Sequence, residues 1–217
     1  MEKLHIYFIP GLAASTDIFE NIRLPNNLFE IHYLSWLVPE SKNETIQNYA
    51  QRMCARIKHD NPILIGVSFG GIMVQEMSKL INTKKTIIIS SIKSDKELPK
   101  RLKFVKFTKA YKLFPTQKII KIEDFSKYAF LKVLKSRARL YQKYLAMKDP
   151  VYLPWAINTV LHWKQKEPLS EIIHIHGNKD IVFPIKKITN CNVIENGTHV
   201  MILNKAKQIS KVLEEVI

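Results

Sequence analysis

One stretch decides how this chain folds: Gly66-Val67-Ser68-Phe69-Gly70-Gly71. It follows the apolar run Ile63–Ile65 and precedes a helical pattern that begins at Ile72. A short β-branched run favours a buried strand, so the six residues are expected to form a strand-to-helix turn. Gly66 and Gly70 must be small, because the chain at so sharp a turn packs closely against itself.

The serine at the centre of this turn is the first candidate functional residue. A Gly-x-Ser-x-Gly sequence between a strand and a helix is a nucleophile elbow, whose strained backbone exposes the serine Oγ above the sheet. Ser68 is therefore the candidate nucleophile, and the N–H of Phe69 at the helix start is directed to where an oxyanion would form. The alternative is an ordinary turn that carries a serine by chance.

Outward from the turn, short apolar runs alternate with longer helical patterns. Several runs are almost continuously apolar, as in parallel strands that are covered on both faces. This alternation predicts an α/β fold with a mostly parallel, doubly wound sheet of about six strands. The expected strands are Leu4–Ile9, Phe29–Leu34, Ile63–Val67, Thr86–Ile92, Ile172–His176 and Asn192–Glu195. The expected helices are Asp17–Ile22, Glu44–Lys58, Gly71–Leu80 and Lys205–Glu215.

The segment between the fourth and fifth expected strands is longer than one crossover helix requires. It follows amphipathic helical patterns that Pro115 and Pro150 interrupt. We predict a helical cap at residues 93–170, inserted into a core formed by residues 1–92 and 171–217. The expected cap helices are Lys96–Leu113, Glu123–Met147 and Tyr152–Trp163.

Positive charge and aromatic side chains are concentrated in this insertion. The chain carries a formal net charge of +15, and residues 93–148 contain 17 Lys or Arg against 4 Asp or Glu, a net +13. This asymmetry suggests a surface that attracts anions, with a generally lysine-rich composition as the equal alternative. The aromatic residues could line an apolar pocket, although most of them are expected to pack the cap helices. They are Phe104, Phe107, Tyr111, Phe114, Tyr128, Phe130, Trp155 and Trp163.

Two further loops carry candidate residues. The loop Pro10-Gly11-Leu12 follows the first strand, where the N–H of Leu12 is a second candidate donor to an oxyanion and an ordinary turn is the alternative. A late strand ends near Gly177, and Asp180 follows it at the edge where open α/β sheets bind ligands. Asp180 is the candidate acid, with an Asx turn or a helix N-cap as the alternative.

His199 is the candidate base. It lies between the last strand and the last helix, in a loop from which an imidazole can reach the elbow serine. The order Ser68, Asp180, His199 is that of α/β-hydrolases and neither that of chymotrypsin nor that of subtilisin. In this arrangement His199 accepts the serine proton while Asp180 holds the imidazole tautomer. Asp95, which follows the strand after the elbow helix, is the less favoured candidate acid.

These motifs in this order resemble the α/β-hydrolase superfamily, in particular its small, cap-bearing, esterase-like members. The resemblance covers residues 4–92 and 171–215 but not the middle segment. It implies a serine hydrolase that cleaves a carboxylic ester or thioester through an acyl-enzyme on Ser68, with no cofactor and no metal. The first loop reads Pro10-Gly11 where many relatives have His-Gly, a difference that bears on the geometry of the oxyanion loop.

Two other functions stay open: a basic-cap binding module for anionic membrane surfaces or ligands, and an acyltransferase. A small-molecule ester or thioester is the expected partner, with weak contact between the cap and an anionic membrane as an addition. No nucleic-acid motif is present, so nucleic acid is not an expected partner.

With no long apolar span and no signal-peptide pattern, we expect a cytoplasmic protein. Cys54, Cys191 and the histidines His5, His32, His59 and His162 match no metal-ligand spacing.

Overall fold

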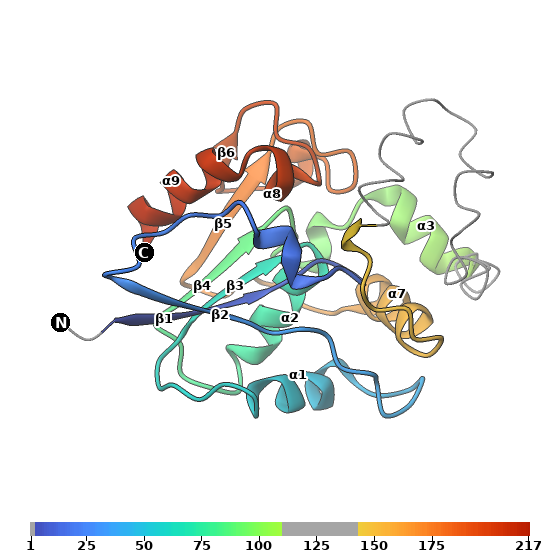
Figure 1. Cartoon of the computed structure of the whole chain (residues 1–217). Helices are drawn as coiled ribbons and strands as arrows, with labels where there is room; N and C mark the ends of the chain where they lie inside the picture. Colours follow the sequence, from blue (N-terminus) through green and yellow to red (C-terminus); the bar gives the residue numbers. More distant parts are fainter. Residues whose placement is uncertain (1–2, 110–142) are drawn as a thin grey trace.

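The computed structural model of the protein describes residues 3–109 and 143–217, and a six-stranded sheet lies at its centre (Figure 1). The strands lie in the order β2-β1-β3-β4-β5-β6, and all neighbouring pairs are parallel. The predicted α/β fold with a parallel sheet of six strands is confirmed. The strands are β1 (Leu4–Ile9), β2 (Phe29–Tyr33), β3 (Ile63–Val67), β4 (Lys85–Ile89), β5 (Ile172–Gly177) and β6 (Asn192–Ile194).

Helices cover both faces of this sheet (Figure 1). The described helices are α1 (Ile46–Cys54), α2 (Phe69–Met77), α3 (Lys100–Thr108), α7 (Tyr152–His162), α8 (Met201–Asn204) and α9 (Ala206–Val216), with the short 3₁₀ helices η1 (Thr16–Phe19), η2 (Asp95–Glu97) and η4 (Ile185–Lys187). One hydrophobic core lies under α1, α2 and α7, and a second lies under η1, α8 and α9. Strand β1 contributes Tyr7 and Ile9 to the first core and Ile6 and Phe8 to the second, because successive side chains of a strand point to opposite faces.

Local backbone chemistry sets the ends of the elements. Helix α1 begins after Thr45, whose side-chain oxygen accepts a hydrogen bond from the Asn48 N–H, as an N-cap residue does. Strand β4 ends at Ile89, three residues earlier than the sequence suggests. Ser90 has a φ of 49°, which a strand cannot accommodate. The chain therefore turns at the same level of the sheet as the end of β3, beside Ser68.

Helix α7 packs firmly on the core. The ring of Trp155 stacks on that of Tyr49 at 4.3 Å between centroids, and its Nε1–H donates to the Glu44 carbonyl at 2.8 Å. Trp163 follows the helix, and its Nε1–H donates to Glu76 Oε1 at 2.7 Å. The two tryptophans thus join this segment to α1 and α2.

Much of the predicted cap falls outside the described residues. The helix expected at Glu123–Met147 lies there almost entirely, as do Tyr111, Phe114, Tyr128 and Phe130. In the described part, α3 buries none of its residues, and the side chains of Phe104 and Phe107 are 66% and 85% exposed. The cap as a unit at 93–170 stays a prediction. Across 3–109 and 143–217, the structure contains no helix with the length and apolarity of a membrane span.

Candidate active site

The strand-to-helix turn between β3 and α2 holds Ser68 in a strained conformation. Its φ of 53° and ψ of −114° lie in a region that residues with a side chain rarely occupy. The neighbouring glycines make the turn possible: an added Cβ at Gly66 would lie 2.1 Å from the Gly70 carbonyl oxygen, and one at Gly70 would lie 2.3 Å from the Ile9 carbonyl oxygen. The sequence therefore dictates a turn that lifts the Ser68 side chain above the carboxyl edge of the sheet.

Ser68, His199 and Asp180 form one hydrogen-bonded chain. Ser68 Oγ lies 3.0 Å from His199 Nε2, and His199 Nδ1 lies 2.9 Å from Asp180 Oδ2. Ser68 comes from the end of β3, Asp180 from the turn after β5 and His199 from the loop between β6 and α8. In a parallel sheet these carboxyl-terminal loops gather at one edge, so residues 131 positions apart come into contact.

Asp180 is fixed in an ionised state by its surroundings. The residue is only 4% exposed, and its Oδ1 accepts hydrogen bonds from the N–H groups of Val182 at 2.7 Å and Phe183 at 2.9 Å. Burial by itself opposes the charge, but the hydrogen bond and charge of His199 and the Phe183 N–H outweigh it and hold the pKa of Asp180 below its usual value. With Asp180 ionised, His199 Nδ1–H is the donor, which leaves the Nε2 lone pair for Ser68.

A second buried histidine, His176, supports this carboxylate. Its Nε2–H donates to the Phe183 carbonyl at 2.8 Å and lies 3.6 Å from Asp180 Oδ2. Burial lowers the pKa of His176, so the ring is neutral and its Nδ1 accepts from His174 Nε2 at 3.1 Å. From the sequence, His176 is only the last residue of an expected strand. Its spacing of four residues from Asp180, across the turn at Gly177, is the signal that could have indicated this contact.

The loop after β1 lies against the elbow. A Cβ added to Gly11 would lie 3.7 Å from Ser68 Cβ, so the following residue, Leu12, borders the nucleophile. Phe69 is the first residue of α2, where backbone N–H groups have no partner within the helix. The two candidate oxyanion donors are therefore both adjacent to Ser68. Asp95 lies elsewhere, beside Trp163 in a separate hollow, with its N–H donating to the Gln165 carbonyl.

An apolar cavity of about 350 Å³ opens over Ser68. Its walls come from the loop after β1, the turn after β5, helix α8 and the segment at Tyr144-Leu145. Tyr144 is the aromatic residue of the predicted cap that lines it in the described part of the chain. The named candidates Phe107 and Trp163 border the hollow beside Asp95 instead. The lining residues are Gly11, Leu12, Ala14, Ile18, Val67, Ser68, Tyr144, Leu145, Lys179, Ile181, Val182, Thr198, His199, Val200, Ile202 and Leu203.

Comparisons with known proteins identify the fold. No protein-family model and no curated protein sequence matches the chain. Solved structures match nearly all of it. They include a carboxylesterase from Nitrososphaera gargenis (TM-score 0.71, 16% identity, 99% of this chain and 89% of that chain). A lipase-esterase related protein from Clostridium acetobutylicum is similar (TM-score 0.64, 16% identity, 98% of this chain and 94% of that chain). MenH from S. aureus is similar too (TM-score 0.67, 14% identity, 100% of this chain and 94% of that chain). This chain has the α/β-hydrolase fold.

Proposed function

We propose that this protein is a serine hydrolase that cleaves a carboxylic ester or thioester through an acyl-enzyme on Ser68. The observation that carries the proposal is the hydrogen-bonded chain from Ser68 Oγ through His199 to Asp180, with Ser68 and His199 in the wall of an apolar cavity. If His199 had only a structural role, nothing would require the strained backbone at Ser68. Backbone strain of this kind is typically found at functional sites, so it supports the proposed role of Ser68.

The proposed reaction has two half-reactions. His199 Nε2 takes the proton of Ser68 Oγ as the oxygen attacks the carbonyl carbon, and the oxyanion is stabilised by the N–H groups of Leu12 and Phe69. The intermediate then collapses: the bond to the leaving oxygen or sulfur breaks, and His199 returns the proton to that group. Water, deprotonated by His199, then attacks the acyl-enzyme carbonyl carbon. The bond to Ser68 Oγ breaks, His199 returns the proton to that oxygen, and the acid is released. Asp180 stabilises the imidazolium in both steps.

The cavity supports a substrate with an apolar acyl group of modest size. Its volume of about 350 Å³ is at the small end of the range for ligand pockets. Its walls are largely aliphatic, and burial of each methylene contributes about 0.8 kcal/mol. Lys179 is exposed at the cavity and provides a positive charge for an acidic group outside the acyl chain.

The proposal is tested by turnover of p-nitrophenyl esters and acyl-CoAs of graded chain length. Ser68→Ala should lower kcat by at least ~10³, because nucleophile and base act as a unit. Ser78→Ala, at the other end of α2, is the matched control and should retain activity, since Ser78 Oγ only donates to the Gln75 carbonyl. Equal activity of the Ser68→Ala variant and the control would refute the proposed function. If the original protein turns over none of these substrates, a binding module would be favoured instead.

A further inference from the structure

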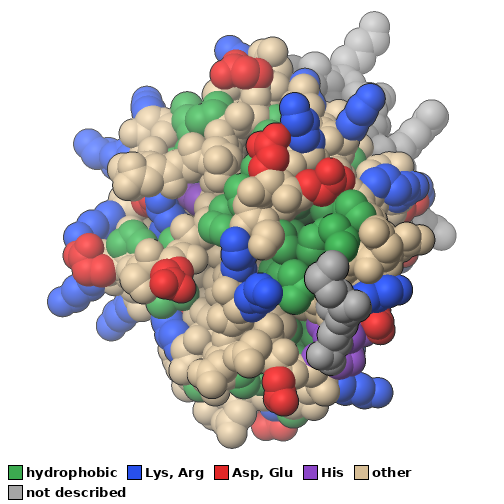
Figure 2. Space-filling model, turned by 90° about the vertical axis from the view of Figure 1, so that its left-hand side faces the viewer, with side chains coloured by type: hydrophobic (Ala, Val, Ile, Leu, Met, Phe, Trp, Pro, Cys, Tyr) green, Lys and Arg blue, Asp and Glu red, His purple; other side chains and the backbone are tan. Residues whose placement is uncertain are grey.

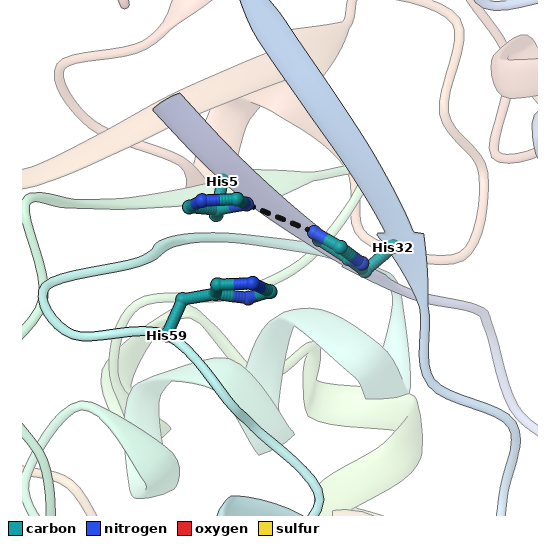
Figure 3. A group of neighbouring side chains, drawn as sticks. All are labelled: His5, His32 and His59. Carbon is teal, nitrogen blue, oxygen red and sulfur yellow. Dashed lines mark hydrogen bonds between the residues drawn. The ribbon is translucent and has the colours of Figure 1, made fainter. Parts of the chain in front are cut away.

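Three histidines from separate elements meet far from Ser68 (Figure 3). His5 lies near the start of β1, His32 on β2, and His59 in the loop between α1 and β3. All three are half-buried, and one ring nitrogen of each lies within 4.8 Å of one nitrogen of the others. Figure 2, which faces the side of the molecule where β1 begins in Figure 1, shows histidine side chains at the surface.

The parallel register of β1 and β2 explains this gathering. His5 pairs with Glu30 and Tyr7 with His32, so all four side chains lie on the face of the sheet that α1 covers. The loop after α1 then places the His59 ring on the same face, where it stacks on His5 at 3.5 Å between centroids. The backbone topology thus imposes a group of three imidazoles beside one carboxylate.

The distances within this group suit a shared metal ion. His5 Nδ1 lies 3.1 Å from His32 Nε2, and Glu30 carboxylate oxygens lie 3.6 Å from His32 Nε2 and 4.0 Å from His5 Nδ1. Tetrahedral Zn²⁺ with bonds of 2.0–2.2 Å holds its ligand atoms roughly 3.3–3.6 Å apart. We propose that His5, His32 and His59, with Glu30 as the fourth ligand, bind a divalent transition-metal ion of the Zn²⁺ class.

The surroundings orient the third ligand. Tyr7 Oη lies 2.7 Å from His59 Nδ1 and accepts a hydrogen bond from the Lys58 N–H at 3.1 Å. If His59 Nδ1–H donates to this oxygen, its Nε2 lone pair is free for the ion, the arrangement by which outer partners fix metal-binding histidines. The His5 and His59 rings are stacked at 7°, so binding requires the half-buried His59 ring to tilt until both lone pairs converge.

Three imidazoles and one carboxylate form a complete set of Zn²⁺ ligands. Neutral imidazole is the form that binds metal. Four protein ligands leave no open position, so the ion would have a structural role in joining β1, β2 and the loop before β3. The ion would be well separated from the elbow: His5 lies four residues, about 13 Å, before Ile9, and Ile9 is in register with Gly66.

The test is Zn²⁺ titration of untagged protein that has been stripped with a chelator, in competition with a chromophoric chelator. We expect one Zn²⁺ per chain, a rise in Tm on binding, and nitrogen coupling in the EPR spectrum of the Cu²⁺-loaded protein. His59→Gln and His32→Gln should each weaken Zn²⁺ binding at least tenfold. His162→Gln, which removes a histidine of α7 outside the group, is the matched control and should bind as the original protein does.

Circular dichroism and urea unfolding of the metal-free variants establish that each is folded, and His59, in a loop, is the milder site for substitution. Failure of the original protein to take up Zn²⁺, or equal binding by the His59→Gln, His32→Gln and His162→Gln proteins, would overturn the proposal. The three histidines would then be only a hydrogen-bonded, stacked group. None of these measurements depends on hydrolysis, so the result is independent of the proposed function.

Discussion

At the scale of single residues, Asp180 is held in one orientation by its hydrogen bonds. The carboxylate is buried, accepts two backbone N–H groups through Oδ1 and holds His199 through Oδ2. Its lowered pKa means that it remains ionised through the neutral range. The hydrogen bonds of Asp180 thus fix the orientation of the His199 ring toward the strained Ser68, which is the preorganisation that the proposed hydrolysis requires.

Asp180→Asn should lower kcat by ~10²–10⁴, because the amide no longer holds the tautomer that leaves His199 Nε2 free to accept the Ser68 proton. Steady-state kinetics on the best ester measures the effect. Asp95→Asn is the comparison, since Asp95 lies beside Trp163 and away from the His199 ring. A large loss of kcat in Asp95→Asn and none in Asp180→Asn would reverse the assignment of the acid.

The buried pair His174 and His176 gives the protein a pH-dependent stability. Burial, followed by the charges of His176 and Lys93, holds the pKa of His174 well below 6.5. The unfolded chain takes up a proton on His174 near pH 6.5, whereas the folded chain does not. The free energy of unfolding is therefore highest above that pH and decreases as the pH falls below it. The free energy of unfolding should fall by up to ~1.4 kcal/mol per pH unit for each such proton.

Urea unfolding between about pH 7.5 and pH 5 measures this slope. In His174→Gln the slope should be shallower by about one proton, whatever the variant does to stability at neutral pH. Identical slopes in the two proteins would show that His174 titrates alike in the folded and unfolded states.

At the scale of elements, the elbow depends on glycine because backbone approaches backbone. Gly66→Ala should destabilise the protein by more than ~3 kcal/mol or prevent folding, since its Cβ would lie 2.1 Å from the Gly70 carbonyl oxygen, which cannot move without disrupting α2. Gly11→Ala is the matched control: its Cβ would make ordinary contacts at 3.7 Å and 3.8 Å. Thermal unfolding that shows equal Tm values for the two variants would contradict this packing.

The sequence predicts elements well where one local pattern determines them. Residues Ile63–Val67 and the glycines after them specify both the strand and the turn, so the elbow follows from a dozen consecutive positions. The end of β4 was predicted three residues too late. Ser90 and Ser91 interrupt the apolar run, but their residue types do not specify the positive φ that ends the strand at Ser90. The contact between His176 and Asp180 requires the shape of the turn at Gly177. The group of His5, His32 and His59 requires the register of β1 on β2, which no local pattern encodes.

At the scale of the whole molecule, the parallel sheet separates two groups of polar residues. Its carboxyl edge carries Ser68, Asp180 and His199, of which Ser68 and His199 line the apolar cavity. His5, His32 and His59 gather toward its amino edge. Because all strands run in one direction, the loops that carry the three candidate catalytic residues meet at the same edge of the sheet. The cavity walls come from core loops, α8 and Tyr144-Leu145, so acyl-chain preference should follow from these described residues.

Two to four additional methylenes on the acyl group should raise kcat/KM tenfold or more until the cavity is full, at ~0.8 kcal/mol per methylene. Lysines between 93 and 148 should also attract an anionic acyl-CoA, so its kcat/KM should fall as salt rises to ~0.5 M. A neutral ester of the same acyl group is the control for the salt effect. Equal kcat/KM for acetyl and octanoyl esters would contradict the cavity's role, and a salt-independent acyl-CoA rate would contradict electrostatic attraction.

The most direct test of the central claim is labelling with a fluorophosphonate, followed by peptide mass spectrometry. We expect one adduct per chain, on Ser68, because an activated serine displaces fluoride far faster than an ordinary one. Labelling should disappear in Ser68→Ala, fall strongly in Asp180→Asn and persist in Ser78→Ala. No adduct on the folded protein, or an adduct at another serine that survives Ser68→Ala, would contradict the claim that Ser68 is the nucleophile.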